Sequence, residues 1–294
     1  NACRHRGTRL VDEATAPQPC KGIVCPYHAW SYGTDGACRA IPLQNTVFPG
    51  LDRAEMGLRP LGCRVMGGLV WVVPQRGAPW PADDGLESVC ADFDALGLGD
   101  DHPFATHVSQ VAGNWKLIMD AFFESYHVKR LHKDTIAPFF LDGVAVADRQ
   151  GAHFRNAVAR QGLVDLKGAR PPLARMRDNV TFSYNLFPGV VVIFSPDYVN
   201  VMTLWPVAVD HTTVIHHMLI DAAPDTPEAQ AHWQRSFDML IGGVFEAEDL
   251  ATAARVHKGL ADRPEEELLI GTLENGVAAF HEAVDRALAA IQHV

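Results

Sequence analysis

CPYHAWSYGTDG, at residues 25–36, and NACRHRG, at residues 1–7, are the two segments that decide the fold. Each contains a Cys and a His close together in sequence, Cys3-x-His5 and Cys25-x-x-His28. Zinc accepts two thiolates and two imidazoles, although zinc sites more often combine paired cysteines with paired histidines. The alternation of Cys and His instead suits two irons that share bridging sulfides, with both Cys on one iron and both His on the other.

Composition excludes several classes of protein. The chain has 294 residues, 48% hydrophobic and 20% charged, which is typical of a soluble protein of about two domains. Its 25 Lys and Arg against 35 Asp and Glu leave a net charge of −10, and no basic block points to nucleic acid. No apolar run is long enough to span a membrane. With only six Cys in a chain of this length, we expect a reducing, cytoplasmic location.

A second group of candidate metal ligands lies in residues 114–132, NWKLIMDAFFESYHVKRLH. Apolar residues at helical spacing predict a helix that Asn114 caps, with Glu124 and His127 on one face. His132 lies about 140° further round, so His127 and His132 can meet at one metal only if the helix breaks between them. Two His and a distant carboxylate would form the facial triad of a non-heme Fe(II) oxygenase. Taken alone, a His pair on the surface of a helix end explains these residues more simply.

Together the two groups resemble the α (catalytic) subunits of Rieske non-heme iron ring-hydroxylating oxygenases of the α-only type, over roughly residues 1–260. In such a domain, strands normally precede the first cluster loop, so we expect the N-terminal strands of the Rieske domain to be missing here. The four cluster ligands that the resemblance implies are Cys3, His5, Cys25 and His28.

The resemblance also assigns roles around the mononuclear iron. His127 and His132 correspond to iron ligands, and Glu124 stands where the family usually has an Asp that carries electrons from a neighbouring subunit's cluster. Asp120 is the rival for that role, but it lies two helical turns before His127 and is more simply an ordinary polar residue.

The third iron ligand is expected in residues 245–260, FEAEDLATAARVHKGL. In the family, a late helix carries an Asp ligand followed by a V-Q-R-G-L-like end, which VHKGL at residues 256–260 matches. Counting back from that end implies Asp249. Glu246 and Glu248 are rivals, although a solvated acidic turn near a helix start is the simpler explanation of both. Ala254 stands where the family often has a Glu.

Patterns of apolar residues predict an α+β fold. Segments 180–187, 190–195, 199–209 and 212–221 read as consecutive antiparallel strands, and helices are expected near 228–241, 245–260 and 265–292. Shorter strands are expected at 22–25, 61–65 and 69–73, and a linker rich in Pro and Gly lies within 74–95. We therefore predict a Rieske domain at 1–80 and a catalytic domain at 95–294, for which the resemblance implies a helix-grip fold.

The predicted antiparallel sheet and a long helix are expected to enclose an apolar substrate pocket. An ordinary hydrophobic core explains its candidate lining residues equally well: Phe187, Val192, Phe194, Met202 and Met218.

The resemblance implies the oxygenase component of a multicomponent enzyme. Such an enzyme uses O2, and electrons from NAD(P)H that arrive through a reductase, with or without a ferredoxin. It hydroxylates, dihydroxylates or demethylates a small aromatic or methylamine-type substrate, and its subunits form a head-to-tail homotrimer. Two other classes stay open: a Rieske electron carrier, and a helix-grip protein that binds a hydrophobic ligand without oxygenase activity.

Overall fold

The computed structural model describes residues 1–12, 19–80, 85–168, 171–263, 265 and 267–291. They divide into two compact units. One contains Asn1–Arg64 and Val70–Trp80, and the other contains Val65–Leu69 and Pro81–Val294. The predicted domain limits of 1–80 and 95–294 remain a prediction. No helix in the described part of the chain is both long enough and apolar enough to cross a membrane.

The first unit has a small antiparallel sheet in the order β1-β2-β3 (Ile23–Val24, Ser31–Tyr32 and Cys38–Ala40). The helical turns α1 (Gln44–Val47) and η1 (Arg53–Met56) follow. Its core is built largely from the cluster loops themselves, because their Cys and Trp side chains are buried there. The buried members are Cys3, Cys25, Trp30, Tyr32, Cys38 and Ile41.

The predicted hairpin is confirmed as β4 (Gly62–Met66) and β5 (Leu69–Val73). Its two-residue turn, Gly67-Gly68, has φ values of +57° and +74°, which favour glycine and match the twist of paired strands. A Cβ on Gly68 would also lie 2.6 Å from the backbone nitrogen of Gly99, so glycine is needed here for space as well as for conformation.

The second unit is built on a seven-stranded antiparallel sheet in the order β6-β12-β11-β10-β9-β8-β7. The sequence predicts the last four strands in chain order, and these are confirmed. It misses the first three, whose apolar pattern is interrupted by polar residues: β7 is an edge strand that is exposed along most of its length. The strands are β6 (His102–Val111), β7 (Phe140–Gln150), β8 (His153–Arg160), β9 (Val180–Leu186), β10 (Val190–Phe194), β11 (Tyr198–Ala208) and β12 (His211–Ile220).

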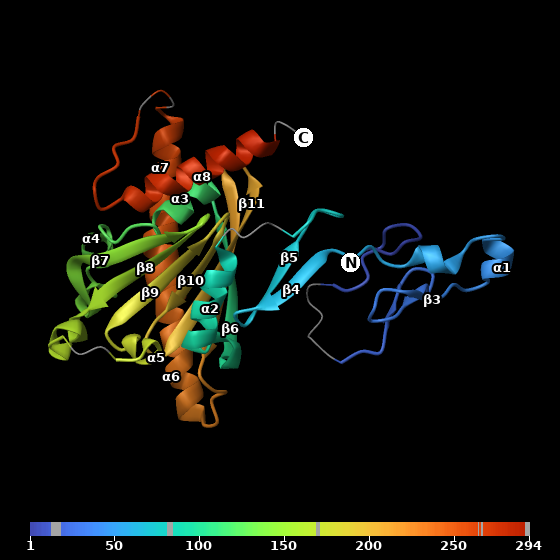
Figure 1. Cartoon of the computed structure of the whole chain (residues 1–294), viewed down its shortest axis with the longest axis horizontal. Coiled ribbons are helices and arrows are strands. Elements are labelled where there is room, and N and C mark those ends of the chain that lie inside the picture. The colour runs from blue at the N-terminus through green and yellow to red at the C-terminus, as the bar shows by residue number, and fades with distance from the viewer. Residues whose placement is uncertain (13–18, 81–84, 169–170, 264, 266, 292–294) are drawn as a thin grey trace. The chain divides into compact units, whose positions relative to one another are not determined.

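One long helical rod crosses this sheet, from α6 (Pro227–Asp238) through the π-helix η5 (Met239–Leu250) to α7 (Ala251–Ala261) (Figure 1). The rod, α3 (Trp115–Asp120) and α8 (Asn275–Ile291) share one hydrophobic core with the sheet. The predicted α+β, helix-grip architecture is thus confirmed.

The helix predicted over 265–292 begins only at Asn275. The other helices are α2 (Leu86–Leu96), α4 (Val128–Leu131), α5 (Leu173–Met176), η2 (Leu98–Asp100), η3 (Ala137–Phe139) and η4 (Gln161–Leu166).

Close packing fixes the loop between α3 and α4, which carries Glu124. A Cβ on Gly276, near the start of α8, would lie 2.7 Å from the carbonyl oxygen of Phe123, so only glycine permits this approach. The carbonyl of Phe122 accepts hydrogen bonds from Asn156 Nδ2 at 3.3 Å and Asn185 Nδ2 at 2.6 Å. Helix α8 and the sheet therefore hold two adjacent residues of this loop, Phe123 and Phe122.

An ion pair also joins α3 to α8. Asp120 Oδ1 lies 2.9 Å from His281 Nε2, and this hydrogen bond raises the pKa of His281 above its ordinary value. Lys116 opposes the shift and Asp285 adds to it. Burial raises the pKa of Asp120 despite the nearby His281. Asp120, the alternative to Glu124 as the electron-carrying acid, therefore forms a structural ion pair with His281.

We expect replacement of His281 by Asn to cost at most about 1 kcal/mol, and more at pH 6 than at pH 8.5. A raised pKa in the folded state means that the stabilisation is complete below the unfolded pKa and is lost as the pH rises through the folded pKa. Thermal unfolding of both proteins at the two pH values measures the difference. His232→Asn is the control, because His232 has no ion-pair partner in the described chain. An equal cost of His281→Asn at both pH values would contradict the expectation.

Candidate metal centres and substrate cavity

Two tight turns in the first unit present the cysteines. The amide of Gly7 donates to the carbonyl of Cys3, and the amide of Ala29 donates to the carbonyl of Cys25, at 2.9 and 3.0 Å. Both turns use left-handed backbone, at Gly7 (φ +77°) and Ala29 (φ +57°). Both thiols are buried. Burial alone raises the pKa of Cys25, but hydrogen bonds from the amides of Tyr27 and His28 and from Cys3 and Thr8 bring it below its ordinary value.

The same turns bring the two histidines together. The rings of His5 and His28 lie 4.7 Å apart between centroids, and Trp30 stacks on His5 at 5.1 Å. His5 Nδ1 is buried without a hydrogen-bond partner. Burial, and then the neighbouring His28 and Arg6, lower the pKa of His5, so the neutral ring that a metal requires is favoured. The two thiols lie together, the two imidazoles lie together, and this donor set fits a Rieske cluster, in which both Cys bind one iron and both His bind the other.

Tyr32 supports one of these thiols. Its hydroxyl lies 3.2 Å from Cys3 Sγ and accepts a hydrogen bond from the amide of Arg4 at 3.0 Å. The hydroxyl proton is therefore free to point at the sulfur. Hydrogen bonds to the sulfurs of an iron–sulfur cluster tune its reduction potential, so Tyr32, which the sequence did not single out, would tune a cluster bound by Cys3. Of the other cysteines, Cys38 and Cys90 are buried, whereas Cys20 and Cys63 are exposed.

In the second unit, His127 and His132 stand at the two ends of the one-turn helix α4, Val128–Leu131. Their rings lie 5.1 Å apart between centroids. The single regular helix through residues 114–132 that would keep the two rings apart is not formed. Helical structure stops at Asp120, resumes at Val128 and ends at Leu131, and His132 lies outside helical geometry at φ −92° and ψ 23°. That departure turns the second ring towards the first.

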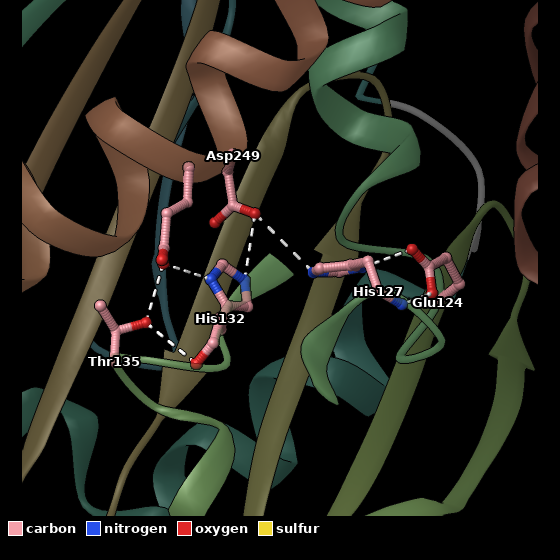
Figure 2. A network of polar contacts seen from close by, with 6 residues as sticks. Glu124, His127, His132, Thr135 and Asp249 are labelled. Atoms are coloured by element: carbon pink, nitrogen blue, oxygen red, sulfur yellow. Dashed lines mark hydrogen bonds and ion pairs between the residues drawn. The ribbon is translucent and has the colours of Figure 1, made fainter. Parts of the chain in front are cut away.

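Both imidazoles are oriented by a carboxylate on Nδ1 (Figure 2). Glu124 hydrogen-bonds to His127 Nδ1 and accepts from the His127 amide at 3.1 Å. Glu248 Oε2 lies 2.7 Å from His132 Nδ1 and also accepts from Thr135 Oγ1 at 2.8 Å. An Nδ1–H that donates to a carboxylate leaves the lone pair on Nε2, which is the arrangement of metal-bound histidines.

Both Nε2 atoms face one oxygen of Asp249 (Figure 2). Asp249 Oδ1 lies 3.2 Å from His132 Nε2 and 3.7 Å from His127 Nε2, and it has no hydrogen-bond partner although it is buried. All three ligand atoms lie within 4.8 Å of one another. Burial by itself lowers the pKa of His132, but Asp249 and Glu248 hold it above its ordinary value, so the site attracts positive charge. The set therefore fits a divalent metal bound by two His and one carboxylate.

The two rivals of Asp249 have other contacts. Glu246 Oε1 accepts from Ser109 Oγ at 2.7 Å and lies 2.9 Å from His107 Nε2, and these partners, despite burial, lower its pKa. Neither Glu is a simple solvated acid, so the expectation of a solvated acidic turn is wrong. The role of Glu248 is not evident from the family pattern, because that pattern specifies only the residues that bind the metal directly. A search for a second carboxylate, which metal-bound His usually requires, would have drawn attention to it.

A cavity of about 730 Å³ opens beside His127, His132 and Asp249. Polar side chains of the sheet, such as Asn156, Thr181 and Asn200, form part of its wall. Aromatic rings from the loop after α3, from η3, β7, β11 and the rod form another part: Phe122, Phe123, Phe139, Phe140, Tyr198 and Phe245. The five side chains that the sequence offered as lining are not in this wall: Phe187, Val192, Phe194, Met202 and Met218.

Side-chain alternation explains that correction in part. On β10, Ile193 points into the cavity, so Val192 and Phe194 point to the other face of the sheet, where Phe194 packs 5.5 Å from Phe93 of α2. The remaining three belong to the core below the helices. Met202 and Met218 are fully buried there, and Phe187 packs against α8.

Comparisons with known proteins agree with this geometry. Residues 98–290 match the family model described as "Ring hydroxylating alpha subunit (catalytic domain)", and residues 1–52 match "Rieske [2Fe-2S] domain". The chain is 25% identical to the carnitine monooxygenase oxygenase subunit of Acinetobacter pittii, over 97% of this chain and 76% of that protein. It is 24% identical to the glycine betaine monooxygenase oxygenase subunit of Pseudomonas aeruginosa, over 75% of this chain and 58% of that one.

Solved structures share the fold. A crystal structure of the quaternary ammonium Rieske monooxygenase CntA superposes with a TM-score of 0.80 at 20% identity, over 97% of this chain and 76% of that one. Naphthalene 1,2-dioxygenase superposes with a TM-score of 0.71 at 16% identity, over the same shares of the two chains. The family match, which covers most of the chain, carries the conclusion: this protein belongs to the catalytic alpha subunits of the Rieske non-heme iron ring-hydroxylating oxygenases.

Proposed function

We propose that this oxygenase subunit oxidises a methylated ammonium compound in the cavity beside His127, His132 and Asp249. When bound, the mononuclear iron supplies O2 activation and the Rieske cluster supplies the electrons, which a reductase partner delivers. The single observation that supports the site is the convergence of two Nε2 atoms on the unpartnered Oδ1 of Asp249 at a cavity wall.

The chemistry of the cavity supports an ammonium substrate. Aromatic faces attract organic cations, and the wall adds the carboxylates of Glu124 and Asp197. Relatives of this chain are named for carnitine, glycine betaine and choline, all of which are trimethylammonium compounds. The aromatic part of the wall also limits the access of water to the reacting carbon.

Three acidic side chains of the chain prepare the site for a metal. Glu124 and Glu248 hold the Nδ1 protons of the two histidines, so that both Nε2 lone pairs point to one place. Asp249 supplies the only negative ligand atom of the three. We propose further that Glu124 passes electrons from the cluster of a neighbouring subunit, in a head-to-tail trimer, as in the family that the chain resembles.

The proposed function predicts oxygen uptake with trimethylammonium substrates. With a Rieske reductase and NADH, we expect L-carnitine, glycine betaine or choline to stimulate O2 consumption with stoichiometric product. Naphthalene is the contrasting substrate, and protein without reductase is the control. Product from naphthalene alone, with no product from any of the three ammonium compounds, would overturn the ammonium assignment.

Replacement of Glu124 by Gln should stop turnover even when excess Fe(II) keeps both metal centres loaded, because the amide lacks the negative charge of the carboxylate; its effect on Fe(II) affinity should be no larger than that of Glu248→Gln. Iron and sulfide analysis should still give about three Fe per two sulfides, with the EPR signal of the reduced cluster unchanged. Asp120→Asn is the matched control and should keep turnover. Full activity of Glu124→Gln would reject the electron-bridge role. An iron content of two per two sulfides in the unsubstituted protein would favour a simple electron carrier.

Glu248→Gln should weaken Fe(II) binding about 10- to 100-fold, because the second carboxylate orients the ring of His132. Equilibrium binding of Fe(II) to the apoprotein measures this directly. Glu246→Gln serves as the control two residues away and should bind iron as the unsubstituted protein does. If Glu246→Gln lost iron and Glu248→Gln retained it, the roles assigned to the two acids would be reversed.

A further inference from the structure

Arg160 stands in the cavity wall as the last residue of β8. Asn156, Val158 and Arg160 alternate along this strand and all line the cavity, so Arg160 faces the same space as the side chain that holds the Phe122 carbonyl. Its Nη1 donates to Thr181 Oγ1 at 3.1 Å. The guanidinium lies over two rings of the wall, 5.5 Å from the Phe139 centroid and 5.3 Å from that of Phe140.

The charge of Arg160 lacks a counter-ion within the described residues. Among the described residues, no carboxylate lies within 4 Å of the Arg160 nitrogens. The acid whose charge raises the pKa of Arg160 is Asp197, which is exposed and lies beyond that distance. Burial lowers the pKa of Arg160, since the half-buried cation has lost solvation, while Tyr198 and Asp197 oppose that effect. Thr181 is a neutral acceptor and leaves most of the five guanidinium N–H groups unused.

Arg155, on the same strand, is by contrast neutralised by two acids. Arg155 Nη1 lies 2.7 Å from Asp92, and a second nitrogen pairs with Asp148. A partly buried cation without an anion is costly, so a cavity that keeps one gains from a ligand that brings an anion. Arginine matches the planar fork of a carboxylate with two parallel hydrogen bonds.

We propose that Arg160 is the specificity-determining residue of this cavity and binds the carboxylate of a substrate that also carries the oxidised ammonium group. Only the ammonium end of this substrate depends on the function proposed above; the carboxylate end is argued from Arg160. Arg160 lies four positions along β8 from Asn156, which is next to the iron-site loop, and four positions span roughly 13 Å along a strand. The carboxylate and the oxidised end therefore lie towards different ends of the substrate, as in an ω-trimethylammonio carboxylate.

Direct binding tests this with two compounds that differ in one charge: γ-butyrobetaine and its methyl ester. Titration calorimetry with the iron-loaded protein, without O2 or reductant, gives both dissociation constants. We expect Arg160→Gln to weaken binding of γ-butyrobetaine roughly 10- to 100-fold and to leave the ester within about threefold. Arg160→Lys keeps the charge but loses the fork, and should lie between. Arg149→Gln is the control, because Arg149 also lies over a phenyl ring, that of Phe154, but does not line the cavity.

The outcomes separate this proposal from the proposed function. Equal losses for acid and ester in Arg160→Gln, or no loss for either, would overturn the carboxylate site, even if trimethylammonium compounds are oxidised. Hexanoate has a carboxylate but no ammonium group. If Arg160→Gln weakens binding of both γ-butyrobetaine and hexanoate but not of the ester, the carboxylate site is supported even if no ammonium compound is turned over. Binding of choline as tight as that of γ-butyrobetaine to the unsubstituted protein would also overturn it.

Discussion

A buried carboxylate oxygen that faces two imidazole nitrogens is the constraint on which the catalytic unit depends. Asp249 Oδ1 has no hydrogen-bond donor of its own, and the two Nε2 atoms can satisfy it only as cations or through a shared metal. Each ring is held in that direction by a second carboxylate on Nδ1. Five ionisable groups thus fix one another around one point, and a divalent cation is what completes them.

The rest of the unit positions these groups. Asp249 and Glu248 are neighbours in the rod, yet they reach opposite nitrogens of the same ring of His132. They lie in the π-helix η5, whose wider turn departs from the α-helical wheel used to compare acids in the sequence. On the other side, the loop with Glu124 is held by two Asn side chains of the sheet and by the close approach of Gly276. Packing energy from one hydrophobic core therefore maintains the electrostatic site.

The two metal centres are built in different ways. The cluster donors come from two short turns whose amides point at their own Cys carbonyls and thiols, so each half of the site is defined within a few residues. The mononuclear site joins a loop to a rod that lies more than a hundred residues later in the chain. Local turns keep their geometry through nearby hydrogen bonds, whereas the distant ligands depend on the sheet and helices that lie between them.

The sequence by itself determined the two donor sets, the four consecutive strands from β9 to β12 and the α+β class, because metal-ligand spacing and apolar alternation are local patterns. It could not separate the function of Glu248 from that of Asp249, since adjacent acids look alike until a particular ring lies between them. It also could not identify the cavity wall. The side chains of Val192 and Phe194 point away from the cavity because of strand register, and Met202 and Met218 are covered by helices. Only the tertiary structure decided those points and brought Arg160 into the wall, because side-chain direction and burial depend on packing between distant segments.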